Sequence, residues 1–271
     1  MTASEDRACG KGWEMHLAEA YDWALNADDD SIDALITDPP YSSGGFVRGD
    51  RTATTRTKYV KSGASVELED FDGDNRDQRG FLAWCTLWLT EALRIVKPGC
   101  PIGVFTDWRQ LPITTDAVQA GGFVWRGIAV WTKGGMSRPQ MGRYRSDAEY
   151  LVWGSRGPMR SGEDVGVLPG SWKSSPVAHG ERVHITQKPV EVMEEVVRIA
   201  PPEGRVLDLF AGSGSTGVAC LRRGRRFVGV ERSAINFAIA CERLRAEESS
   251  SSYRDRIAGQ TALFGAKEDC T

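Results

Sequence analysis

The sequence lacks the features of a membrane-bound or secreted protein. No apolar run among its 271 residues reaches the roughly 18 that a membrane-spanning helix needs. The N-terminal stretch MTASEDRACGKGWEM carries acidic side chains where a signal peptide would be basic and then apolar. We therefore expect a soluble, cytoplasmic protein with one large domain.

Histidine and closely paired cysteines are also scarce. The three histidines and six cysteines include no Cys-x-x-Cys pair and no zinc-ligand spacing. We therefore predict no metal site, and we expect reduced thiols that mostly fill the core.

A strong excess of one charge is missing as well. The formal net charge of -3 excludes a uniformly basic nucleic-acid binder. Basic residues instead gather in two segments rich in glycine, serine and threonine, residues 48–61 and 133–160. We interpret both as loops that contact nucleic acid, although an ordinary solvated surface would carry the same charges. The candidate contacts are Arg48, Arg51, Arg56, Lys58, Arg138, Arg143 and Arg145.

Apolar runs alternate with helix-like segments along the chain, which is typical of an α/β fold with a mostly parallel sheet. The main domain is expected to span residues 1–247 and to be followed by a polar tail, 248–271. The polar segment 42–78 predicts a long functional loop. Strands are predicted within 33–38, 101–107, 123–135, 148–155, 205–210 and 226–231. Helices are predicted within 80–99, 109–122, 187–204, 218–224 and 234–248, with Pro189 in a first turn.

The segment VLDLFAGSGSTG predicts a strand, a glycine-rich turn and the start of a helix. Gly212 and Gly214 allow close backbone approach, and the N–H groups of a helix N-terminus favour an anionic ligand. Glu231 ends the next strand, where a carboxylate can bind both hydroxyls of a ribose. A nicotinamide-dependent dehydrogenase shares this pattern and is an alternative. However, the chain after Glu231 is too short for the second half of a dinucleotide fold.

A second motif lies in ITDPPYSSGG, where an apolar strand ends on Asp38, Pro39, Pro40 and Tyr41. The amino group of a nucleobase is a poor nucleophile because its lone pair is delocalised into the ring. Two acceptors, the Asp38 carboxylate and the Pro39 carbonyl, would accept hydrogen bonds from the two N–H groups of this amine and leave its lone pair directed outward. Proline restricts the backbone there. The ring of Tyr41 offers a stacking face, so the expected guest is a base flipped out of its helix.

These motifs together resemble those of the DNA amino-methyltransferases. The catalytic motif Asp-Pro-Pro-Tyr comes first, TQKP follows, and the cofactor motif D-x-F-x-G-S-G comes last. That order resembles the circularly permuted beta class of the family. The resemblance implies a three-layer α/β sandwich with a mostly parallel, seven-stranded sheet and one reversed strand. It also implies S-adenosylmethionine as the methyl donor.

The resemblance further assigns roles to individual residues. It places Lys188, Phe210, Ser213 and Ser215 near the methionyl part of the cofactor and Glu231 on its ribose. Asp208 opens the cofactor motif. The segment HLAEA places Glu19 where an acid binds the adenine of the cofactor, with Ala18 and Glu19 replacing the usual glycine and aspartate.

Asp at the first catalytic position usually accompanies N6 methylation of adenine in this class, so the sequence favours adenine in double-stranded DNA. The resemblance also implies that residues of about 133–183 recognise the target, and this segment is too short for a strict, long site. It allows a homodimer, a cognate restriction enzyme and a nucleoid-associated enzyme of bacterial or phage origin. Methylation of cytosine N4 or of RNA, and a catalytically silent DNA-binding module, stay as alternatives.

Overall fold

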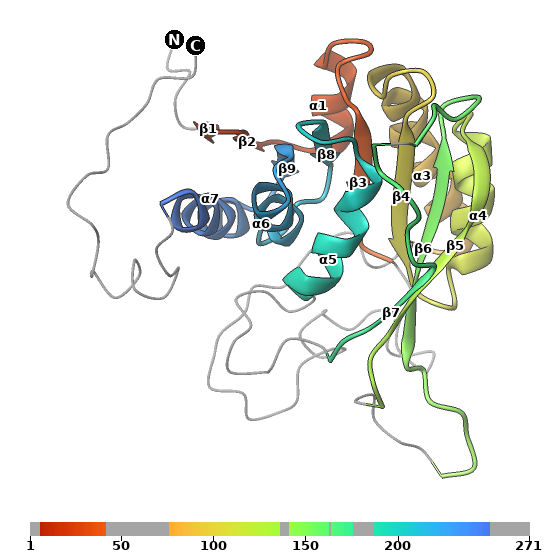
Figure 1. The fold of residues 1–271 in the computed structure, drawn as a ribbon. Helices are drawn as coiled ribbons and strands as arrows, with labels where there is room; N and C mark the ends of the chain where they lie inside the picture. The colour runs from red at the N-terminus through yellow and green to blue at the C-terminus, as the bar shows by residue number, and fades with distance from the viewer. Residues whose placement is uncertain (1–5, 42–75, 136–140, 163, 176–186, 250–271) are drawn as a thin grey trace.

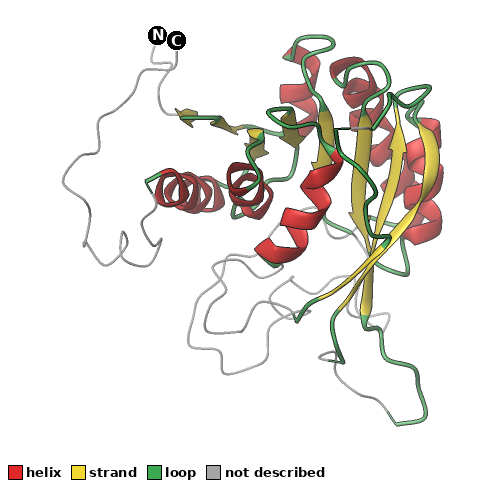
Figure 2. Ribbon diagram, viewed as in Figure 1, coloured by secondary structure: helices red, strands yellow, loops and turns green. Residues whose placement is uncertain are grey.

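The computed structural model describes residues 6–41, 76–135, 141–162, 164–175 and 187–249. Within these ranges the chain forms one mixed sheet with helices on both faces (Figure 1, Figure 2). The helices are α1 (Ala20–Asn26), α3 (Gln78–Ile95), α4 (Leu111–Ala120), α5 (Val190–Val196), α6 (Ser215–Arg222) and α7 (Ala234–Glu248). A 3₁₀ turn, Val197–Ile199, continues α5.

The described sheet has nine strands in the order β1-β2-β9-β8-β3-β4-β6-β5-β7. Strands β2, β9, β8, β3 and β4 run parallel, whereas β6 is antiparallel to both β4 and β5. Strands β1 and β7 extend the two edges. Their bounds are β1 Arg7–Gly10, β2 Trp13–Leu17, β3 Ala34–Thr37, β4 Pro101–Thr106, β5 Val124–Thr132, β6 Ala148–Ser155, β7 Ser171–Lys173, β8 Arg205–Asp208 and β9 Arg226–Glu231.

Strand β3 lies near the middle of the sheet and is buried on both faces. Ala34 and Ile36 belong to the core that α5, α6 and α7 share with the sheet, whereas Leu35 belongs to the core beneath α1, α3 and α4. A continuous apolar run is what a doubly covered parallel strand requires. The two helical layers therefore fix β3, and with it the position of the segment that follows.

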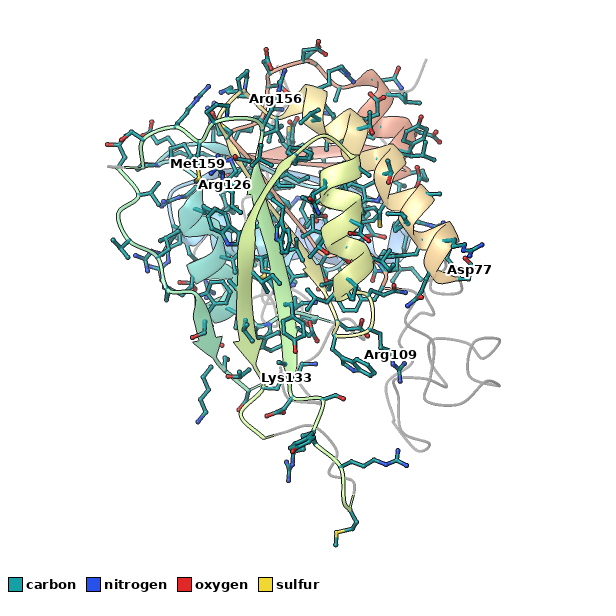
Figure 3. The ribbon with its side chains drawn as sticks, turned by 90° about the vertical axis from the view of Figure 1, so that its right-hand side faces the viewer. Asp77, Arg109, Arg126, Lys133, Arg156 and Met159 are labelled. Atoms are coloured by element: carbon teal, nitrogen blue, oxygen red, sulfur yellow. The ribbon has the colours of Figure 1, made fainter. Side chains whose placement is uncertain are left out.

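The strand directions decide which residues meet at one edge of the sheet. The carboxyl ends of the parallel strands lie together, and the reversed strand β6 begins at that same edge because Tyr150 pairs with Thr106, the last residue of β4. Figure 3 shows Lys133 and Arg109 at this end of the strands and Arg126, Arg156 and Met159 at the other.

The structure confirms the α/β fold with its mostly parallel sheet. Seven strands with β6 reversed form the centre that the resemblance implied, and six of them were located in the sequence. Strands β1, β2 and β7 and helix α1 were not located. Pro189 is the N-cap of α5 and not part of its first turn. The prediction of reduced thiols was wrong for Cys9, which is disulfide-bonded. Cys85, Cys100, Cys220 and Cys241 are free and buried.

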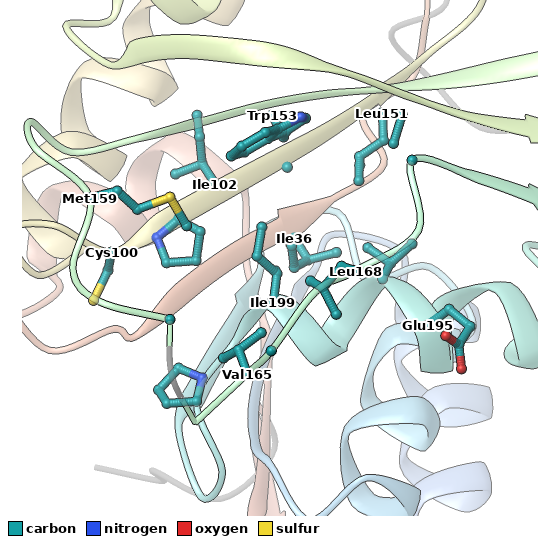
Figure 4. A pocket seen from close by; sticks show the side chains of 18 of the residues that line it. Ile36, Cys100, Ile102, Leu151, Trp153, Met159, Val165, Leu168, Glu195 and Ile199 are labelled. Atoms are coloured by element: carbon teal, nitrogen blue, oxygen red, sulfur yellow. The ribbon is translucent and has the colours of Figure 1, made fainter.

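An apolar cavity of about 480 Å³ lies on the face that carries α5, lined in part by residues of 159–162 and 164–170 (Figure 4). Ile102, Trp153 and Ile199 line it, and it reaches the amino end of β4 at Cys100. Among the described residues no helix could cross a membrane, and no cluster of potential ligands could hold a metal ion.

Candidate active site

Asp38 directly follows β3 at the carboxyl edge of the sheet, and the residues around it make two side-chain hydrogen bonds. The hydroxyl of Thr37 donates to Asp208 at the end of the neighbouring strand β8, over 2.7 Å. Pro39 is buried, and Pro40 is half-buried. Across the two prolines, the Tyr41 hydroxyl donates to Oδ1 of Asp38 over 2.7 Å. The structure therefore brings the predicted carboxylate and ring together.

Lys188 reaches the same carboxylate from the segment before α5. Its ammonium donates to Oδ2 of Asp38 and lies 3.0 Å from the Tyr41 hydroxyl. The rings of Phe105 and Tyr41 lie 5.1 and 5.3 Å from Nζ. In the described structure this lysine contacts the catalytic motif directly, and it is only 7% exposed.

Glu149 completes this group of side chains, and the sequence analysis missed it. Its Oε1 pairs with Lys133 Nζ at 2.6 Å, whereas its Oε2 lies 3.1 Å from Lys188 Nζ. The same Oε2 lies 3.1 Å from the Tyr41 hydroxyl. Glu149 stands near the start of β6, and only the reversed direction of that strand brings it to this edge. The sequence feature that could have indicated Glu149 is a carboxylate at the second position of the otherwise largely apolar strand β6.

The charges of this group balance. Asp38 and Glu149 face Lys188 and Lys133, so two carboxylates meet two ammonium groups. Burial raises the pKa of Asp38, which Lys188 opposes. Burial also acts to raise the pKa of Glu149, but Lys188 and Lys133 outweigh it and lower the value to about 2. Burial and the two carboxylates raise the pKa of Tyr41 well above its ordinary value, so its hydroxyl remains a donor.

A second group lies beside the first, at the ends of β8 and β9. Gly212 and Gly214 adopt φ values of 51° and 79°, which favour glycine. The N–H of Gly212 donates to Oε2 of Glu231, and the N–H of Ser233 donates to Oε1, each over 2.8 Å. The Glu231 carboxylate is thus held between the turn and the start of α7. Burial raises its pKa.

This arrangement fits the ribose of S-adenosylmethionine. The backbone N–H groups of Gly212, Arg232 and Ser233 all donate to the Glu231 carboxylate, which has about four lone-pair sites. The fixed carboxylate can therefore still accept a hydrogen bond from a ribose hydroxyl. Glu19 follows β2 by two residues and lies near Glu231. Leu17 pairs with Glu231, and the N–H of Ala18 donates to the Glu231 carbonyl. However, Glu19 caps α1, with Tyr21 N donating to its Oε2 over 2.6 Å.

The other predicted cofactor residues make contacts within the protein. Arg243 of α7, which the sequence analysis missed, donates to the carbonyl of Ser213, and its Nη1 lies 3.1 and 3.3 Å from the hydroxyls of Ser213 and Ser215. Both serine side chains are buried on this guanidinium. They support the turn from beneath, which a motif alone could not reveal.

Asp208 and Phe210 are likewise held by the chain. Thr37 and Thr216 donate to the two oxygens of Asp208, over 2.7 and 2.6 Å, and burial raises its pKa to about 6. The ring of Phe210 packs against Trp84 and Trp88, with centroids 5.4 Å apart in each pair. In this structure both residues anchor the glycine turn.

The described part of the chain contains two of the seven predicted DNA contacts. Arg143 and Arg145 lie exposed in the loop between β5 and β6, where the side chains of Met141 and Tyr144 are also fully exposed. Arg145 donates to the carbonyl of Gly135. The others, Arg48, Arg51, Arg56, Lys58 and Arg138, lie outside the described residues.

Comparison with known proteins identifies the family. Residues 32–241 match the N6_N4_Mtase family model, described as DNA methylase. YubD of Escherichia coli (strain K12), named only as a methylase, is 31% identical over 202 residues, which cover 74% of this chain and 76% of YubD. The type II methyltransferase M2.DpnII of Streptococcus pneumoniae is 26% identical over 241 residues, covering 82% and 85% of the two chains.

Solved structures agree on the fold. The M1.HpyAVI–SAM complex has a TM-score of 0.60 at 23% identity, covering 86% of this chain and 98% of the other. The cytosine-N4-specific PvuII DNA methyltransferase has a TM-score of 0.65 at 15% identity, covering 92% and 93%. The chain therefore belongs to the N6/N4 family of S-adenosylmethionine-dependent DNA methyltransferases.

Proposed function

We propose that this enzyme transfers a methyl group to the exocyclic N6 of adenine in double-stranded DNA. The observation that supports the proposal most is the position of the Asp38 carboxylate. It lies at the end of a buried strand, beside the Tyr41 ring and at the same edge as the glycine turn and Glu231. An acceptor, a stacking face and a ribose site are thereby combined at one edge.

Asp38, Pro39 and Tyr41 hold the base in this proposal. Asp38 and the Pro39 carbonyl accept the two N–H groups of the amine, which localises the nitrogen lone pair. Stacking on an aromatic ring contributes roughly 1–3 kcal/mol per base, and this offsets part of the few kcal/mol that base flipping costs. Pro39 and Pro40 restrict the turn, so the acceptors do not have to be ordered during the reaction.

S-adenosylmethionine supplies the methyl group when bound. The turn at Gly212 and Gly214 and the carboxylate of Glu231 would hold its ribose and methionyl parts, with Glu19 beside the adenine. The serine hydroxyls, Asp208 and Phe210 keep the turn in shape. Arg143 and Arg145 bind phosphates in this proposal, together with the basic residues outside the described ranges.

Adenine is favoured over cytosine because the first residue of the catalytic motif is aspartate. Both bases remain within the family, since its model is named for N6 and N4 methylation and the PvuII enzyme is cytosine-N4-specific. Methyl transfer from labelled S-adenosylmethionine to unmethylated DNA, followed by mass spectrometry of the nucleosides, tests the proposal. N6-methyladenine supports the proposal. N4-methylcytosine would show that adenine is not the target base, and transfer to RNA alone would show that DNA is not the substrate.

A further inference from the structure

We propose that Glu149 is an alternate acceptor that takes Lys188 and Tyr41 away from Asp38 when the target base enters. Glu149 is in this view a positioning residue, because it acts on the base through the two donors. The inference rests on the proposed function of Asp38 as the acceptor of the amino group.

Asp38 is engaged before any substrate arrives. The Tyr41 hydroxyl donates to one oxygen and the Lys188 ammonium to the other. A base nitrogen becomes positively charged as it accepts a methyl group. An ammonium group on the carboxylate that should stabilise this charge would oppose it. Lys188 must therefore weaken its contact with Asp38 for the reaction to proceed well.

The second acceptor is already within hydrogen-bond reach. Oε2 of Glu149 lies 3.1 Å from Nζ of Lys188 and 3.1 Å from the hydroxyl of Tyr41. Tyr41 has a single hydroxyl proton, which can be donated to Asp38 or to Glu149 but not fully to both. Small side-chain rotations would complete the exchange without any movement of the backbone.

The charges permit this exchange. Lys133 pairs with the other oxygen of Glu149, so Oε2 is the oxygen that receives the two donors. The group of two carboxylates and two ammonium ions is neutral before the exchange and stays neutral after it. The Asp38 carboxylate loses both donors in the exchange, and leaving it buried and unpaired would be costly. The amino group of the entering base takes their place, so Asp38 exchanges its partners as the base binds.

The first test is the variant Glu149→Gln, which keeps the shape but removes the second anion. Lys188 then has Asp38 as its only carboxylate, and the amino group of the base must compete with it. We expect kcat/KM for duplex DNA to fall at least tenfold, with affinity for S-adenosylmethionine within twofold of wild type. Glu242→Gln is the matched control, since Glu242 is exposed and pairs with Arg245 in α7.

The second measurement separates positioning from a purely structural role. Binding is compared for two duplexes that differ only at the mapped target base, which in one duplex lacks its exocyclic amino group. Wild type should prefer the amino-bearing duplex, and Glu149→Gln should lose most of that preference. Adding Lys188→Met to Glu149→Gln removes the competing ammonium and should restore it. A structural lesion would leave the preference unchanged or lower it further.

Lys133→Met provides a test that does not require the Gln variant to fold. It leaves Glu149 with fewer partners, so Lys188 should move further from Asp38. The preference for the amino-bearing duplex should equal or exceed that of wild type.

The inference is overturned if Glu149→Gln keeps the wild-type kcat/KM and preference, or if Lys133→Met lowers the preference. If wild type itself transfers no methyl group to DNA, the proposed function fails and this inference fails with it. If wild type is active and Glu149→Gln has the same kcat/KM and the same preference, the exchange of donors is refuted while the proposed function stands.

Discussion

Arg243 is predicted to support the cofactor turn from beneath, and Arg243→Leu tests this. The variant removes the guanidinium that donates to the Ser213 carbonyl and contacts two serine hydroxyls in a site that is 9% exposed. Hydrogen bonds to charged groups contribute about 1.5–3 kcal/mol each, and an orphaned buried acceptor costs about 1–3 kcal/mol. Leucine recovers some apolar burial, and two of the contacts are long. We expect the free energy of unfolding to fall by about 2–4 kcal/mol.

The matched control is Arg245→Leu, two residues along the same helix. Arg245 pairs with Glu242 at 2.9 Å on the surface, where such pairs contribute about 0–1 kcal/mol. Urea unfolding measures stability, and calorimetric titration measures binding of S-adenosylmethionine. Arg243→Leu should also weaken binding, because the turn from Gly212 to Ser215 loses its support. Equal stability and equal affinity for both variants would show that Arg243 does not support the turn.

Three further predictions concern other parts of the site. The pKa of Asp208 is raised to about 6 in the folded state, from about 3.9 in the unfolded state. The folded state therefore binds more protons, and the free energy of unfolding falls as pH rises from about 4 to 6. In Asp208→Asn, unfolding experiments across that range should no longer show this contribution to the pH dependence. Gly217→Ala places a Cβ 2.6 Å from the ring of Phe227. Overpacking costs about 1–3 kcal/mol, which should exceed the roughly 1 kcal/mol gain in helix propensity, so thermal melting should show a lower Tm. Arg143→Ala with Arg145→Ala should weaken DNA binding and reduce the slope of log affinity against log salt by up to roughly 1.8, since each lost phosphate contact removes about 0.9.

The parts of the site that lie within one contiguous motif could be predicted from the sequence. Asp38 and Tyr41 are joined by two prolines, and the glycine turn follows a strand directly. In both cases the local residues restrict the backbone and thereby place the functional group. Strand ends also share an edge in any parallel sheet, which is why Asp38 after β3 and Glu231 at the end of β9 lie at the same edge.

Contacts between distant segments could not be predicted in the same way. Glu149 reaches Tyr41 only because β6 is reversed and lies next to β4. The direction in which Ser213 points depends on how α7 packs, since Arg243 comes from that helix. A polar residue in a glycine turn has the same sequence pattern whether it faces a ligand or a neighbouring helix.

The extra edge strands show a similar limit. Strand β1 has only four residues and β7 only three, and each lies against a single neighbour. Such short segments carry too little apolar periodicity to be recognised. Their pairing is determined by the strand beside them and not by their own sequence.

The most direct test of the central claim is methyl transfer to unmethylated duplex DNA with nucleoside mass spectrometry, run for wild type, Asp38→Ala and the exposed control Asp116→Ala. We expect N6-methyladenine from wild type and from Asp116→Ala, whose side chain is exposed. Asp38→Ala should give at least a hundredfold less, since loss of one preorganised hydrogen-bonding group typically costs about 10²–10³ in rate. Calorimetric titration should show that Asp38→Ala still binds S-adenosylmethionine. Undiminished transfer by Asp38→Ala would show that this carboxylate does not hold the reacting amino group.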